Sequence, residues 1–267
     1  MEFEFMDAPA PETLARSLEL LYALGAVTDK GALSRTGRRM ASLPIDIKLA
    51  KAILASETYG CTEEVLTIAA MLQESAALWI KPPKDKKLQG DAARERFVSK
   101  EGGDHLTLLN VYNAWEEADY SVQFARENWL QQRCLNRARE VREQMRQLCD
   151  RVELEVSSCG TDHVAIRKAL TAGFFPNAAA LQRDGQSYRT LHTKVTAHIH
   201  PSSCLHQIRP KHLVYYELVL TSKEFLRQNF PIDPEWLMEV APHYYKPGSI
   251  EVPKKMGKGP GKVGTDR

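Results

Sequence analysis

The sequence lacks the features of a secreted, membrane-spanning or disulfide-stabilised protein. Its five cysteines include no C-x-x-C pair, and an odd number of cysteines cannot all pair with one another. No run approaches the roughly 18 apolar residues of a membrane-spanning helix, and the N-terminus has no basic flank before an apolar core. These absences favour a reduced intracellular compartment and give no indication of a membrane.

Motifs of known catalytic chemistry are also missing. The chain has no G-x-x-x-x-G-K-[ST], no G-x-S-x-G, no H-E-x-x-H and no G-x-G-x-x-G after a predicted strand. The glycine-rich stretch 257–264 lacks both the following Ser or Thr and the strand-to-helix context of a phosphate loop. We therefore expect no catalysis and no cofactor in this chain.

Charge and composition are those of an ordinary globular chain and single out no partner. The 267 residues carry 36 basic and 34 acidic side chains, a net charge of +2, and are 43% hydrophobic. At about 100 to 200 residues per domain, this length allows two or three modules, each with its own core.

Residues 13–80 predict a winged-helix module. Apolar residues at helical spacing lead from Thr13, a candidate N-cap, to Gly25, and residues 26–34 resemble a small hairpin or wing. Three further helices are expected over residues 35–42, 45–57 and 62–73, the last capped by Thr62.

Residues 81–90 contain two prolines and several charges, which predicts a linker between modules. Residues 91–173 then predict a helical bundle, in which Asp104 follows two glycines and is expected to cap a helix. The tryptophans lie in apolar periodic stretches and are expected in the core: Trp79, Trp115, Trp129 and Trp236.

After Gly173 the hydrophobic period changes to two. Short strands are expected over residues 178–183, 187–192, 195–200 and 213–221, with a short helix from Asp233-Pro234. A small OB-fold barrel over 174–245 fits this pattern, and periodicity alone does not separate it from an SH3-like barrel. The expected fold class is α+β multidomain: a linker (1–12), helical winged-helix and bundle modules, a β-barrel and a flexible basic tail (246–267).

The window 183–212 carries the strongest functional signal from the residues themselves. It holds five basic residues against Asp184, and five histidines. On a barrel, such cations can neutralise phosphates while an aromatic ring stacks on a base. The candidate nucleic-acid contacts here are Arg183, Tyr188, Arg189, Lys194, His200, Ser202 and Ser203. The alternative is an ordinary solvated face.

Two further patterns in the sequence involve histidines. His105 follows Asp104 near a predicted helix start and could approach a phosphate, although the spacing alone favours a capping aspartate with an incidental histidine. The spacing of His198, His200, Cys204 and His206 is compatible with a transition metal, but no carboxylate or C-x-x-C supports it, so no metal site is predicted.

Several segments together resemble the C-terminal half of DEAH-box RNA helicases, in matching order along nearly the whole chain. They are FEFMDAPAPETL (3–14), GALSRTGRRMASLPID (31–46), EEVLTIAAML (63–72), GGDHLTLLNVYNAW (102–115), IRKALTAGFF (166–175), HIHPSSCL (198–205) and VYYELVLTSKEFLR (214–227). The ending WLMEVAPHYYK (236–246) most resembles the pre-mRNA splicing members, closest to the one that activates the spliceosome.

This resemblance implies a winged helix, a ratchet bundle and an OB-fold that close a channel for single-stranded RNA. The chain begins where the second RecA-like lobe would end, so ATP and Mg²⁺ would bind only to the motor lobes of the parent helicase. By position, residues 102–105, 188–194 and 200–203 would lie near the RNA.

The resemblance also implies partners and a location. These are single-stranded pre-mRNA, a G-patch activator docked on the winged helix (13–80), spliceosomal proteins and the nucleus, with the chain itself a monomer. An alternative function is a protein-interaction platform for splicing factors with little RNA binding of its own.

Overall fold

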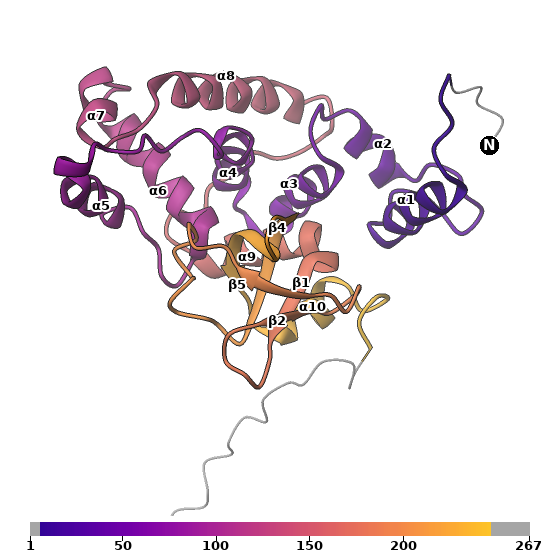
Figure 1. Cartoon of the computed structure of the whole chain (residues 1–267). Coiled ribbons are helices and arrows are strands. Elements are labelled where there is room, and N and C mark those ends of the chain that lie inside the picture. The colour runs from indigo at the N-terminus through magenta and orange to yellow at the C-terminus, as the bar shows by residue number, and fades with distance from the viewer. Residues whose placement is uncertain (1–5, 247–267) are drawn as a thin grey trace, which may run out of the picture.

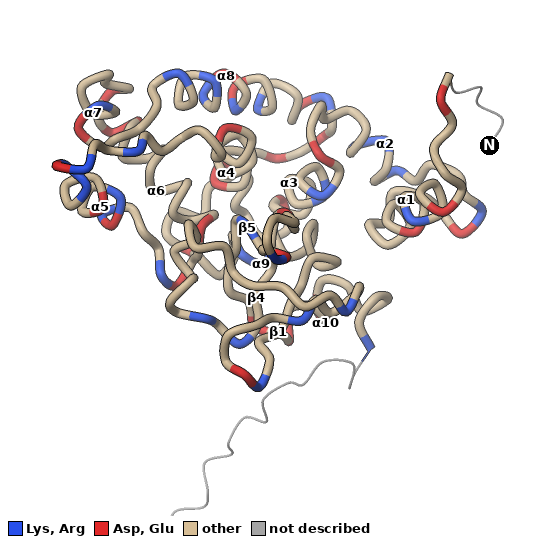
Figure 2. Tube along the Cα trace, viewed as in Figure 1, with Lys and Arg blue, Asp and Glu red and all other residues tan. Residues whose placement is uncertain are grey.

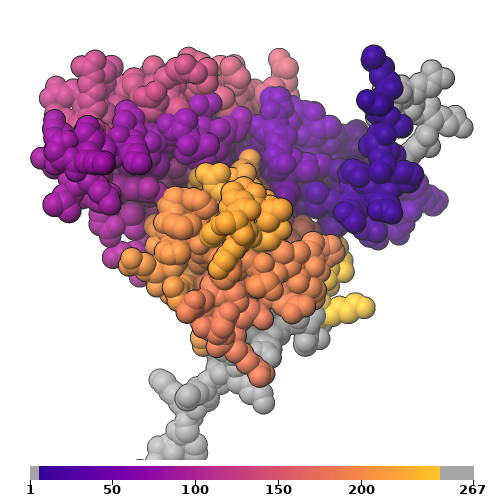
Figure 3. Space-filling model, viewed as in Figure 1, coloured from indigo at the N-terminus to yellow at the C-terminus, as the bar shows by residue number. Residues whose placement is uncertain are grey.

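The computed structural model describes residues 6–246, and most of the predicted basic tail (246–267) lies outside this range. A layer of helices covers a small β-barrel (Figures 1 and 3). The α-helices are α1 (Pro11–Ala23), α2 (Arg35–Ala41), α3 (Ile47–Tyr59), α4 (Thr62–Glu74), α5 (Lys87–Glu95), α6 (Gly103–Glu117), α7 (Val122–Glu127), α8 (Gln132–Cys149), α9 (His163–Phe174) and α10 (Pro234–Val240). Short 3₁₀ turns are η1 (Lys84–Lys86) and η2 (Phe175–Asn177).

The first helices follow the predicted winged-helix pattern with different caps. A β-bridge joins Val27 to Leu33 and forms the small wing. Thr13 does not cap α1, because the helix already begins at Pro11, whose missing N–H suits a first helical position. Thr62 does not cap α4 either. Its hydroxyl donates instead to the carbonyl of Glu155, 2.9 Å away, and ties the helix to the segment after α8.

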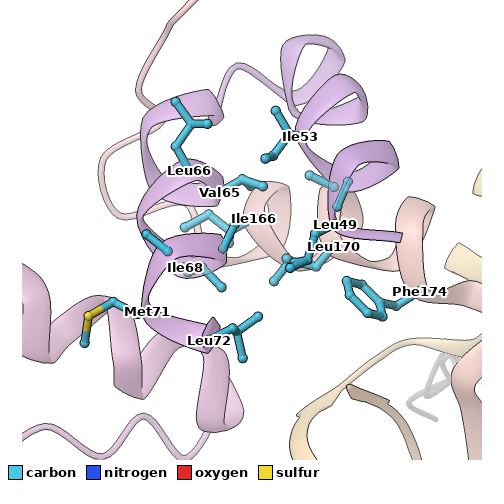
Figure 4. Close-up of a cluster of buried hydrophobic side chains, with 14 of the residues drawn as sticks. Leu49, Ile53, Val65, Leu66, Ile68, Met71, Leu72, Ile166, Leu170 and Phe174 are labelled. Carbon is cyan, nitrogen blue, oxygen red and sulfur yellow. The ribbon is translucent and has the colours of Figure 1, made fainter. Parts of the chain in front are cut away.

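Helices α3, α4 and α9 enclose the main core. Figure 4 shows Leu49 and Ile53 of α3 facing Val65 of α4 and Ile166 of α9, and all four side chains are fully buried or nearly so. α3 packs closely along α9, while α4 also contacts α6 and α8. The helical part therefore shares one continuous core, whose apolar burial is its main source of stability.

A five-stranded closed barrel follows the helices, in the order β1-β2-β3-β5-β4. Its strands are β1 (Ala178–Leu181), β2 (Tyr188–Thr190), β3 (Thr196–Ile199), β4 (His212–Leu220) and β5 (Glu224–Pro231). The parallel pairing of β3 with β5 closes the barrel. The predicted fold class, helical modules followed by a small OB-type barrel, is confirmed.

β5 was absent from the sequence prediction. Its residues, EFLRQNFP, place three polar side chains between the apolar ones, so the alternation typical of a strand is weak. It nevertheless pairs with β4 from Leu220 opposite Glu224 to Leu213 opposite Pro231. Long-range pairing thus determines this strand where the local pattern does not.

The predicted domain boundaries stay a prediction. The segment expected as a linker, 81–90, contains η1 and the first turn of α5. Gly90 of α5 is buried, and an added Cβ there would come within 2.5 Å of Pro82 Cγ. Pro82, at the start of this segment, therefore packs against Gly90 in the first turn of α5.

Candidate nucleic-acid interface

The bundle is joined to the barrel by a buried carboxylate at the start of α6. Asp104 is 8% exposed and does not cap its own helix, which begins one residue earlier at Gly103. Its oxygens accept hydrogen bonds from the Ser203 hydroxyl (2.6 Å), the Cys204 amide (2.8 Å) and the Asn229 amide (2.8 Å). The predicted role as a helix cap is corrected: Asp104 instead connects α6 to β5 and to the loop after β3.

We call these contacts of Asp104 with Ser203, Cys204 and Asn229 the joint between bundle and barrel. His105 lies beside this joint and is fully buried. Its ring packs edge-on against Phe230, with 4.8 Å between ring centroids, and neither ring nitrogen has a hydrogen-bond partner among the described residues. Burial lowers the pKa of His105 to about 3, so the ring is neutral at neutral pH. The predicted RNA contact by His105 is therefore corrected, because the side chain has no surface to offer a ligand.

His105 should make stability depend on pH. Its folded-state pKa of about 3 lies below the ordinary 6.5, so the unfolded chain binds more protons and stability falls as the pH falls through about 6.5. Between pH 7 and 5, we expect His105 alone to account for a loss of about 2 kcal/mol. Urea unfolding at both pH values should show this loss in the wild type and not in His105→Phe. An equal pH dependence in both proteins would contradict it.

Next to the joint, a cavity of about 210 Å³ opens between the bundle and the barrel. Its helical side holds Trp79 and Arg94, with the guanidinium 4.9 Å from the centre of the indole ring. Arg94 also donates a hydrogen bond of 2.7 Å to the carbonyl of Ser202, so α5 is tied to the loop of the barrel. The wall thus combines an aromatic face with a cation.

The barrel side of the cavity presents polar groups from β3, β5 and the loop after β3. The amide and hydroxyl of Ser202 lie 3.1 Å and 2.7 Å from His200 Nδ1. Because the amide can only donate, Nδ1 accepts and the ring proton belongs on Nε2. Burial, then the charges of Arg227 and His206, lower the pKa of His200, so its ring is neutral and offers one N–H donor.

Arg227 of β5 supplies the second cation of this cavity. Its guanidinium lies 3.1 Å from a carboxylate oxygen of Glu217, across the β4–β5 pair, and its side chain is 30% exposed. The pairing aligns Arg227 while leaving other N–H donors for a ligand. Arg94 and Arg227, with Trp79 and His200, therefore form the walls of a site suited to a phosphate and a stacked ring.

The predicted site residues separate into three groups. His200 and Ser202 line the cavity. Tyr188 and Ser203 are buried, with the phenol donating to the carbonyl of Pro210 and the Ser203 hydroxyl to Asp104, so their predicted RNA contacts are corrected. Arg183, Arg189 and Lys194 are exposed on β2 and its flanking turns but do not line this cavity, and their roles stay predictions.

Sequence reasoning missed Trp79, Arg94 and Arg227. Trp79 is expected in the core from the sequence, yet it is only partly buried, and Arg94 lies in the predicted bundle (91–173) with no local feature that marks it as a ligand contact. The resemblance segment 214–227 ends on Arg227, but β5 was not recognised, so nothing placed this arginine beside His200. The periodicity of helices and strands predicts local structure, but it does not predict which segments far apart in the sequence come into contact.

A second cavity, of about 260 Å³, lies on the barrel itself. His198, His206 and Phe225 line it, together with Gln186 of the β1–β2 turn and Lys223 of the β4–β5 turn. Loops in these positions are common ligand-binding elements of OB-folds. The histidine-rich window is thus divided between two cavities.

Other site types find no support in the described part of the chain. Within residues 6–246, no three His, Cys, Asp or Glu side chains come together as a metal-binding group, so the spacing of His198, His200, Cys204 and His206 assembles no such cluster. No helix among these residues is both long and apolar enough to span a membrane.

Three family models match successive parts of the chain. Residues 17–45 match a helicase associated domain described as winged-helix, and residues 46–108 match its ratchet-like part. Residues 166–244 match an oligonucleotide/oligosaccharide-binding (OB)-fold. Arg94 falls within the ratchet-like match, and His200 and Arg227 within the OB match, so both walls of the cavity belong to recognised modules. The chain therefore carries the C-terminal module of the DEAH-box helicases.

Proposed function

We propose that this chain binds single-stranded RNA as the C-terminal region of an ATP-dependent DEAH-box helicase, in which other parts of the protein hydrolyse ATP. The observation that carries the proposal is the cavity in which Arg94 from the bundle and Arg227 from the barrel face one ligand space. Cations and an aromatic ring are the groups that proteins use to hold a single strand without reading its sequence.

The joint at Asp104 supports this function mechanically. It fixes the start of α6 against β5 and the loop after β3, so the two walls of the cavity keep their spacing. A motor that shifts RNA needs such a rigid element to hold the strand between steps. The chain would act passively, by binding phosphates and resisting backward movement.

Removing both cations of the cavity should weaken RNA binding in a salt-dependent way. For Arg94→Gln/Arg227→Gln, we expect the slope of log affinity against log salt to fall by about 1.4, because each phosphate contact on a single strand contributes about 0.7. At roughly 0.1 M salt this corresponds to about a 10- to 30-fold loss. Fluorescence anisotropy with a labelled oligoribonucleotide measures both quantities.

The control is Arg16→Gln/Arg151→Gln, which removes the same charge from exposed positions outside this cavity. It should change the slope much less. Wild-type binding that is absent at low salt, or that does not depend on salt, would refute the proposed function.

A second candidate function is docking of a G-patch activator and splicing factors on the winged helix. It is favoured by the apolar side chains exposed there, with Tyr22 52% and Leu33 48% exposed. Splicing of pre-mRNA and a nuclear location are parts of the same proposal and rest on the resemblance of the sequence. A G-patch peptide that binds the chain, and still binds when Arg189 and Lys194 are replaced, would favour this function.

A further inference from the structure

The groove between α5 and α7 is a separate cavity of about 640 Å³ on the bundle. Its lining includes Lys86 of η1, Gln89 and Ala93 of α5, Arg96 directly after α5, and Arg126 and Trp129 from α7 and the segment after it. The first four recur at intervals of three and four residues, so they lie along one face of the helix. Figure 2 shows basic residues interspersed with acidic ones on α5 and α7.

The side chains of the groove offer cations to a ligand. Those of Lys86 and Arg126 are exposed and make no hydrogen bond or ion pair with another described residue. Arg96 donates a hydrogen bond of 2.7 Å to the side-chain oxygen of Asn128. This bond connects the end of α5 to the end of α7. The one carboxylate of the lining, Glu127, accepts from Gln123 at 2.7 Å. The groove is therefore cationic, with a partly buried indole beside its charges.

The groove and the first cavity lie on two sides of the same structural unit. Residues 78–80 pair with residues 129–131 through the amides of Ile80 and Gln131, each 2.8 Å from its acceptor. Trp79 on one strand of this pair lines the cavity between bundle and barrel, whereas Trp129 on the other lines the groove. α5 contributes Arg94 to the cavity, and Arg96, directly after α5, lines the groove. A strand that leaves the cavity past α5 would thus meet a second aromatic ring flanked by cations.

We propose that this groove is a second contact site for single-stranded RNA, in which Lys86 and Arg126 bind phosphates and Trp129 stacks on a base. The inference rests on the proposed function, because it extends the strand held between Arg94 and Arg227. An RNA strand fits better than an acidic peptide because the groove repeats the combination of aromatic ring and cations beside the first cavity.

Binding of two oligoribonucleotides to the full chain tests the inference. One has about four nucleotides, the lower end of OB-fold site sizes, and is chosen to occupy the first cavity, and the other has about twelve and is chosen to extend to the groove. For Lys86→Gln/Arg126→Gln, we expect affinity for the longer strand to fall roughly 10- to 30-fold at about 0.1 M salt, with a salt slope lower by about 1.4. Affinity for the shorter strand should not change.

The same-charge control is again Arg16→Gln/Arg151→Gln. An equal effect of the groove and control variants on the longer strand would overturn the inference, and so would an equal loss for both strand lengths. Failure of the wild type to bind the shorter strand would instead refute the proposed function, so the two failures are distinguishable.

Discussion

Asp104→Ala is expected to destabilise the chain by about 4 kcal/mol. The substitution leaves three donors without their acceptor: the buried Ser203 hydroxyl and Asn229 amide, and the partly buried Cys204 amide. Each such donor costs about 1–3 kcal/mol when it is buried without a partner. Because globular domains are stable by only about 5–15 kcal/mol, the loss is large, and urea unfolding measures it directly.

Asp162→Ala is the matched control for this prediction. Asp162 also accepts two backbone amides, from Val164 and Ala165, but as an exposed cap of α9. Its loss should cost only about 1 kcal/mol, since water can replace the acceptor. If the two variants lose the same stability, the joint between bundle and barrel does not have the role assigned to it.

Gly103→Ala should open the same joint by steric conflict. Gly103 has a φ of +75°, and a Cβ there would lie 2.4 Å from the carbonyl oxygen of Asn229 and 2.7 Å from Phe230 Cα. Both contacts are with backbone, so α6 must move away from β5. We expect a loss of at least about 3 kcal/mol in the free energy of unfolding, with weaker RNA binding as the cavity walls separate.

Gly160→Ala is a control that separates the steric conflict at residue 103 from the backbone strain of a positive φ. Gly160 has a similar φ of +61°, and a Cβ there would meet nothing within 4 Å. It should therefore show only the backbone strain of about 1 kcal/mol. The excess loss in Gly103→Ala over Gly160→Ala measures the close approach of α6 and β5, and no excess would contradict that approach. Thermal denaturation of both variants gives the comparison.

Much of the fold is predictable from the sequence because its elements carry strong local signals. Asp233-Pro234 was expected to begin a helix, and α10 begins at Pro234 with the Asp233 side chain accepting from the amide of Glu235. Turn residues likewise separate the strands, as Asp184-Gly185 does between β1 and β2. β5 escaped prediction because its pairing with β3 and β4, and not its own alternation, makes it a strand.

The candidate site was predictable only in part, because it depends on contacts between segments far apart in sequence. His200 and Ser202 were found from their basic neighbourhood and do line the cavity. Asp104 has the sequence signature of a helix cap, and only the packing of α6 on β5 shows that the amides that donate to it lie 100 residues or more away, at Cys204 and Asn229. Tyr188 has the signature of a stacking residue, yet its position on the inner face of β2 buries it.

Hydrogen–deuterium exchange with and without a single-stranded oligoribonucleotide tests the central claim most directly. If RNA binds between the bundle and the barrel, the backbone amides of residues 196–206 on the barrel side and of α5 with the start of α6 on the helical side should exchange more slowly together. Protection confined to the winged helix, or to the exposed turns that hold Arg183 and Lys194, would contradict the claim.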